Sequence, residues 1–144
     1  MTQFRLALAA AVALQLAGPA AHATTAPVDV KVRLLDVASA KGQLLVSLCD
    51  KSTFMRHCAN STRAVAKRGS IEVTFRGVRP GRYAVMVVHD ENSDGRLGRT
   101  SIGIPSEGYG FSRDAKGASG PPSFEQAAVN VSPAGALVNI HLTY

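Results

Sequence analysis

Apolar and polar residues alternate with a period of two along much of the chain, a pattern that predicts half-buried β-strands. Five segments alternate in this way: residues 29–34, 44–49, 71–76, 83–88 and 138–143. Residues 83–88 carry apolar side chains on both faces, so we expect this strand to be central. A shorter strand is expected at residues 127–131.

Turn-forming residues separate these segments, as at Arg79-Pro80-Gly81. Only residues 53–67 have any helical tendency, and residues 62–67 could equally form another short strand. About seven short strands joined by tight turns, with no helices alternating between them, predict an all-β fold. We therefore expect one antiparallel β-sandwich.

The stretch from Asp90 to about Glu125 interrupts this pattern with many glycines and prolines and no convincing strand. A connection of this length inside a compact domain is usually a functional loop. Its apolar and aromatic side chains, such as Tyr109 and Phe111, are too frequent for a disordered segment. We expect one long Gly/Pro-rich loop that packs in a defined shape.

The N-terminal residues 1–23 have the organisation of a secretory signal peptide. Arg5 precedes an apolar run at residues 6–17, and Ala21-His22-Ala23 offers a small-x-small cleavage site before Thr24. The run is shorter than the roughly 20 apolar residues that span a bilayer. The prediction is a periplasmic or secreted domain at residues 24–144, with no transmembrane segment after cleavage.

Two cysteines, Cys49 and Cys58, are present in the chain. A redox couple would normally have the closer CxxC spacing, and a zinc site would need more ligands than the neighbouring His57 provides. In an oxidising compartment, a pair this close most simply forms a disulfide. We predict a structural disulfide.

The formal net charge of the chain is +6. The basic residues are scattered, and neither a nucleic-acid motif nor a series of stacking aromatics accompanies them. The charge therefore indicates a solvated basic surface, and we expect no nucleic acid among the partners.

An acidic loop follows the 83–88 segment. Asp90, Asn92 and Asp94 place oxygen-bearing side chains at every second position, and Gly95 permits a sharp turn. This is the first half of a calcium-loop pattern. The second half is absent, because the twelfth position is Ser101 rather than a bidentate glutamate.

Two interpretations of this loop stay open. A bound calcium ion would also use the backbone carbonyl of Arg96 and the more distant carboxylate of Glu107. Alternatively, the loop consists of Asx turns in which Asp90, Asn92 and Asp94 accept hydrogen bonds from nearby backbone amides. No cofactor other than calcium is indicated.

Four blocks of sequence together resemble the DUF2141 family of bacterial exported proteins of unknown function. The resemblance implies a small β-sandwich of immunoglobulin-like or prealbumin-like type, and it supplies no activity. Members commonly continue the acidic loop with Leu-Asp, whereas here Leu97 is followed by Gly98, so one possible oxygen ligand is missing. The blocks are Arg79–Val85, His89–Asn92, Gly103–Ser112 and Pro121–Ala127.

Two functional hypotheses follow. The first is a non-enzymatic binding or structural accessory protein of the cell envelope, with His89, Tyr109 and Phe111 as possible contacts for a glycan, a peptide or another envelope partner. The alternative is a hydrolase-like enzyme that uses His89 and acidic residues of the 90–107 loop, chiefly Asp90 and Glu107. A nucleophile elbow of the GxSxG type is absent from the sequence.

Overall fold

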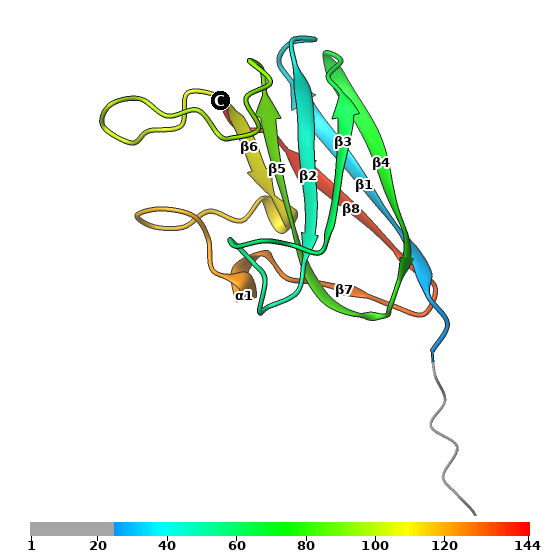
Figure 1. Ribbon diagram of the computed structural model, residues 1–144. Helices are drawn as coiled ribbons and strands as arrows, with labels where there is room; N and C mark the ends of the chain where they lie inside the picture. Colours follow the sequence, from blue (N-terminus) through cyan, green and yellow to red (C-terminus); the bar gives the residue numbers. More distant parts are fainter. Residues whose placement is uncertain (1–24) are drawn as a thin grey trace, which may run out of the picture.

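The computed structural model describes residues 25–144, which form two β-sheets packed face to face (Figure 1). The predicted signal peptide and its cleavage site lie outside the described residues. Within residues 25–144, no helix is long and apolar enough to cross a membrane.

Eight strands build the two sheets. The first sheet has the order β4-β1-β8, and the second has the order β3-β2-β5-β6, with β7 pairing to β5. The predicted all-β sandwich is thereby confirmed. The strands are β1 (Val28–Val37), β2 (Gln43–Cys49), β3 (Asn60–Val65), β4 (Gly69–Val78), β5 (Gly81–Asp90), β6 (Gly108–Phe111), β7 (Val129–Val131) and β8 (Ala136–His141).

The main hydrophobic core lies between the sheets. From Val30 to Leu34, every second side chain of β1 is buried there, as the alternation predicts, and β8 follows the same pattern. Strand β5 lies between β2 and β6, which confirms the predicted central strand. Each fully buried aliphatic side chain contributes about 1.5–3 kcal/mol to the hydrophobic stabilisation. Fully buried members include Val32, Leu34, Leu44, Val46, Val85 and Ile140.

A second, smaller core lies on the opposite face of the second sheet, because β5 is apolar on both faces. Phe54 packs edge-on against two rings, with centroid distances of 6.2 Å to Phe111 and 5.9 Å to Phe124. Ala84 of β5 and Ala127 are buried beneath these rings. The aromatic residues of the long loop therefore pack down on the sheet.

Residues 53–67 were open to a helix or, at residues 62–67, a short strand, and the structure has a strand there, β3, and no helix. Among residues 25–144, the one α-helix, α1, covers Phe124–Ala127. A capping box starts α1: Ser123 Oγ accepts the amide of Gln126, and the Gln126 side chain accepts the amide of Ser123. The strand expected at 127–131 is present as β7, and it begins later because α1 occupies its first residue.

The long connection also contains a strand that the sequence did not predict. Strand β6 pairs with β5 from Met86 to His89. Two of its four residues are glycines, which have low strand propensity, so its partner strand determines its conformation. Gly108 is required here, because a Cβ atom at this position would overlap the ring of Tyr144.

The sandwich is also not wholly antiparallel, because β8 runs parallel to β1. The chain leaves β7 in the second sheet and enters the first sheet beside Val30, close to the start of β1, so both strands run in the same direction. Beyond β8, Thr143 and Tyr109 of β6 exchange backbone hydrogen bonds of 2.9 and 2.8 Å. This pair links the two sheets along one side.

Candidate functional site

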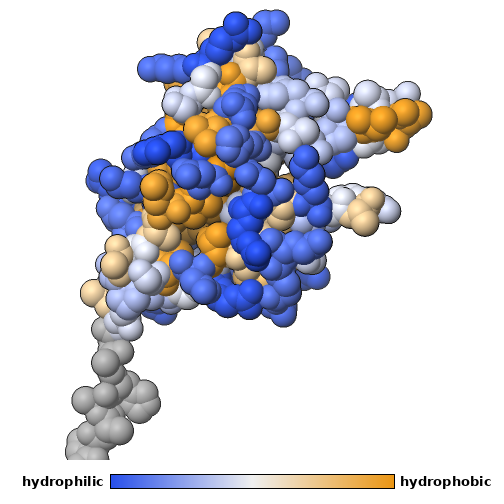
Figure 2. Space-filling model, turned by 180° about the vertical axis from the view of Figure 1, so that it is seen from behind, coloured by the Kyte–Doolittle hydropathy of each residue, from blue (hydrophilic) through white to orange (hydrophobic). Residues whose placement is uncertain are grey.

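Two loops, residues 96–106 and 115–122, project from the same side of the sandwich (Figure 1). Between them lies an open groove of about 730 Å³. Its floor is the outer face of β5 and β6, where Met86 pairs with Phe111 and Val88 pairs with Tyr109. The groove is hollowed between the two projections in Figure 2.

The 96–106 loop has a defined shape and an apolar end. The amide of Thr100 donates to the Ile104 carbonyl at 2.8 Å, and the Arg99 guanidinium donates to the Gly103 carbonyl at 2.8 Å. These bonds hold Ile102 and Ile104 outward, with 80% and 56% of their surfaces exposed. Figure 2 shows a hydrophobic cluster at the end of one projecting loop.

Glu107 anchors the base of this loop. Its side chain is only 7% exposed, and its Oε2 accepts the amide of Gly98 at 2.7 Å. Its Oε1 accepts the amides of Glu91 at 2.9 Å and Asn92 at 3.4 Å. Gly98 is needed for this close approach, since a Cβ atom there would lie 2.9 Å from Ser106 Oγ and 3.1 Å from Glu107 Oε2. The carboxylate therefore joins the acidic loop to the wall of the groove.

Asp90 is fully buried, and its carboxylate is surrounded by donors. Its Oδ1 accepts the amide of Asp94 at 3.0 Å, while its Oδ2 accepts the Gln43 side chain at 2.8 Å and the amide of Gly95 at 2.9 Å. Burial raises the pKa of Asp90, but the hydrogen bonds from Gln43 and from the backbone amides of the loop outweigh it and bring the pKa below its ordinary value.

The side-chain oxygens of Asn92 and Asp94 also accept hydrogen bonds from backbone amides of the acidic loop. The amide of Asp94 donates to Asn92 Oδ1 at 3.1 Å, and the amide of Arg96 donates to Asp94 Oδ1 at 2.9 Å. The structure thus gathers Asp90, Asn92 and Asp94 in one turn, with Glu107 beside it. Among residues 25–144, no group of three or more His, Cys, Asp or Glu side chains is placed to hold a metal ion.

The calcium hypothesis for this loop can be tested by melting the protein with calcium and with EDTA. Because backbone amides already occupy the carboxylates, we expect a dissociation constant no tighter than the roughly 10⁻⁴–10⁻³ M of extracellular modules. Calcium at a concentration about ten times this dissociation constant would raise the melting temperature by at most about 5 °C. A larger rise in the melting temperature, lost in Asp94→Ala, would contradict this expectation, because it would require tighter calcium binding than this geometry offers.

His89 is fully buried and lies apart from the groove. Its Nε2 is 2.9 Å from the carbonyl oxygen of Lys41, which can only accept, so Nε2 carries a proton. Its Nδ1 is 2.7 Å from the hydroxyl of Tyr144, which in turn accepts the amide of Ala38 at 2.9 Å. Both ring nitrogens are therefore engaged in closing one end of the sandwich.

The three residues of the hydrolase hypothesis do not share a cleft. Successive side chains of a strand point to opposite faces, so His89 faces the side of Val85 and Val87, whereas Asp90 faces away. Glu107 is occupied by three backbone amides. The structure does not bring these groups together around a position that a substrate could reach.

Tyr109 and Phe111, predicted as possible ligand contacts, both line the groove. Their rings meet edge to face with centroids 6.3 Å apart. Phe111 is buried, whereas Tyr109 keeps part of its surface accessible. Met86 and Ile104 also line the groove and were not predicted as contacts, although the apolar outer face of β5 was a sequence signal for Met86.

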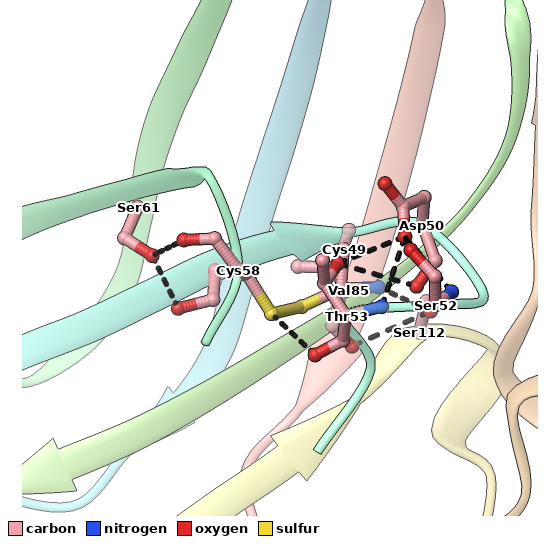
Figure 3. The surroundings of a disulfide bond; sticks show 9 residues. Cys49, Asp50, Ser52, Thr53, Cys58, Ser61, Val85 and Ser112 are labelled. Carbon is pink, nitrogen blue, oxygen red and sulfur yellow. Dashed lines mark hydrogen bonds between the residues drawn. A yellow bond between two sulfur atoms is a disulfide. The ribbon is translucent and has the colours of Figure 1, made fainter. Parts of the chain in front are cut away.

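The predicted disulfide is confirmed. It joins Cys49, the last residue of β2, to Cys58, with a Cα–Cα distance of 5.0 Å (Figure 3). Asp50 Oδ1 braces the enclosed loop by accepting the amides of Ser52 and Thr53, each at 2.9 Å. In the disulfide loop, residues 51–57, Phe54 packs against the second core and Met55 lies at the edge of the groove.

His141 lies at the β8 side of the groove. Its Nδ1 is 2.7 Å from Asp36 Oδ2, and its backbone amide donates to Asp114 Oδ1 at 2.8 Å. The hydrogen bond to Asp36 raises the pKa of His141, desolvation opposes this, and the charge of Asp114 adds to the rise. The groove therefore gains positive charge as the pH falls through this raised value.

The family model described as an uncharacterised protein conserved in bacteria (DUF2141) matches residues 32–139. No curated protein and no solved structure matches the chain. The match spans β1 to β8 and includes both projecting loops.

Proposed function

The chain belongs to the DUF2141 family of uncharacterised bacterial proteins, and we propose that it is an exported, non-enzymatic binding module of the bacterial cell envelope. Two observations support export. Residues 1–23 have the pattern of a signal peptide, and the Cys49–Cys58 disulfide is of a kind that persists in oxidising compartments. The finer assignment, to the periplasm or the exterior, is part of the proposal.

The groove between the 96–106 and 115–122 loops is the observation that carries the binding role. Its volume of about 730 Å³ lies within the roughly 300–1,000 Å³ of small-molecule sites. Its floor is apolar, so the ligand should have a hydrocarbon body. The cationic side chains of Arg99 and Lys116 also line the groove, whereas Asp114 is held by the amide of His141. The ligand we propose is an amphipathic anion of the fatty-acid type.

Two other ligand classes fit the groove less well. A glycan would need several polar groups beside its ring-stacking surface, and the groove floor supplies only the hydroxyl of Tyr109 from its side chains. A peptide that adds a strand would need a free edge on β6. The backbone pair between Tyr109 and Thr143 already occupies part of this edge.

Titration calorimetry with dodecanoate tests the proposal. We expect dodecanoate to bind, and dodecyltrimethylammonium, which has the same chain and the opposite charge, to bind more weakly. Replacing Ile104 by Ser should weaken dodecanoate binding about fivefold, because the chain loses apolar contact area in the groove. Val65→Ser is the matched control, since Val65 is 75% exposed and lies outside the groove.

The pH dependence of dodecanoate binding provides a second test of the proposal. The pKa of His141 is raised above its ordinary value of 6.5, so the side chain is protonated below that raised value. Dodecanoate should therefore bind more tightly at mildly acidic pH than at alkaline pH, and His141→Gln should remove the difference. Equal affinity for both amphiphiles, or equal affinity of Ile104→Ser and wild type, would refute the proposed ligand class.

A further inference from the structure

Two loops bring exposed apolar side chains to one region of the surface. Met55 of the disulfide loop is 46% exposed, and the 96–106 loop presents Ile102 at 80% and Ile104 at 56%. All three residues border the same groove. Soluble proteins rarely gather large apolar side chains at the ends of projecting loops unless another surface covers them.

The charged side chains within these loops are cationic, although the carboxylate of Asp114 also lines the groove. The 96–106 loop contains Arg96 and Arg99, the 115–122 loop contains Lys116, and neither loop contains an acidic residue. The disulfide loop adds Arg56. None of these four cations takes part in an ion pair among residues 25–144. The Arg99 guanidinium donates to a neutral carbonyl, so its charge is not cancelled.

The apolar tip of the 96–106 loop is also preorganised. Besides the Arg99 contact, the amide of Gly103 donates to the Thr100 carbonyl at 2.9 Å, and the amide of Ile104 donates to Thr100 Oγ1 at 3.2 Å. A tip that is already ordered loses little conformational entropy when it inserts into another phase.

We propose that these three loops dock the protein onto the surface of an anionic lipid bilayer. Ile102, Ile104 and Met55 enter the boundary between headgroups and acyl chains, and the surrounding Arg and Lys side chains contact the lipid phosphates. An acidic protein partner would satisfy the charge, but it would not require two isoleucines at the end of a projecting loop. Docking goes beyond the proposed ligand binding and does not depend on it, although it would place the mouth of the groove at the lipid.

Cosedimentation of the exported protein with vesicles tests the docking. We expect binding to vesicles of phosphatidylcholine and phosphatidylglycerol in a ratio of about three to one, weaker binding at high salt, and little binding to phosphatidylcholine alone. Ile102→Ser should reduce the partition coefficient about tenfold, through the lost apolar insertion. Arg96→Gln should reduce it about fivefold, through the lost contact with the anionic surface.

Two controls match these variants. Val65→Ser removes an exposed apolar side chain outside the three loops, and Lys67→Gln removes an exposed cation beside it. Both should bind vesicles as wild type does. The docking proposal is overturned if the protein does not bind anionic vesicles. It is also overturned if Ile102→Ser and Val65→Ser bind these vesicles with equal affinity.

The same variants separate docking from ligand binding. Arg96 does not line the groove, so Arg96→Gln should keep its dodecanoate affinity while losing vesicle binding. Dodecanoate binding without vesicle binding would refute docking alone. Vesicle binding without dodecanoate binding would refute the proposed ligand and leave docking in place.

Discussion

Replacing Asp90 by Ala should lower the free energy of unfolding by about 3 kcal/mol, the larger of the two stability effects that we expect. The substitution leaves the Gln43 side chain and the amides of Asp94 and Gly95 without their acceptor. Because Asp90 is fully buried, solvent does not replace the lost partner without rearrangement of the loop. Urea unfolding at neutral pH, in the presence of EDTA, measures the loss without any contribution from a metal ion.

The pH dependence of this effect identifies the ionised carboxylate as its source. The pKa of Asp90 in the folded state is below its ordinary value of 3.8, so its stabilisation is fully present above that value. The stabilisation disappears as the pH falls through the lowered pKa. The difference between Asp90→Ala and wild type should therefore shrink in strong acid. Asp29→Ala, at an exposed carboxylate, is the control, and an Asp90 effect no larger than its effect would contradict this account.

Removing the disulfide should lower the free energy of unfolding by about 2–3 kcal/mol, because the unfolded chain regains the freedom of a short closed loop. The double variant Cys49→Ala/Cys58→Ala avoids a free thiol. For a domain of this size, the melting temperature should fall by about 10 °C. Calorimetry of the variant, and of wild type treated with reductant, measures the same quantity by two routes.

The disulfide variant should also affect the groove. Without the covalent link, Met55 is positioned by the packing of Phe54, by the hydrogen bonds of Asp50 and by the backbone bond between Arg56 and Thr53. We expect weaker dodecanoate binding even at temperatures where the variant is folded. An unchanged melting temperature would mean that contacts around the loop, rather than the covalent bond, hold it in place.

The strands of the main core could be predicted because burial is periodic in them. In β1, Val30, Val32 and Leu34 are buried while the intervening side chains are exposed, so the sequence carries the pattern directly. Strand β6 carries no such pattern. Its glycines are explained by neighbours that are distant in the chain, namely the Tyr144 ring beside Gly108 and the Ile140 side chain beside Gly110. Such packing cannot be inferred from the local sequence.

The candidate site was predictable to a similar extent. The disulfide followed from the cysteine spacing and the expected compartment, and Tyr109 and Phe111 were predicted only as possible contacts for a ligand. The environment of His89 depends on Tyr144, which is 55 residues away. The acidic loop has oxygens suited equally to a cation or to amides, and the positions of Gln43 and Glu107 determine which donors surround them.

The separation of the two cores has a consequence for how such a fold can diversify. The core between the sheets contains no residue of the 96–106 or 115–122 loops. Substitutions in these loops can therefore change the surface that is presented without disturbing the framework that carries it. The arrangement resembles that of antibody variable domains, in which a constant sandwich supports interchangeable loops. Proteins that share this framework can thus acquire different ligands through changes in these loops alone.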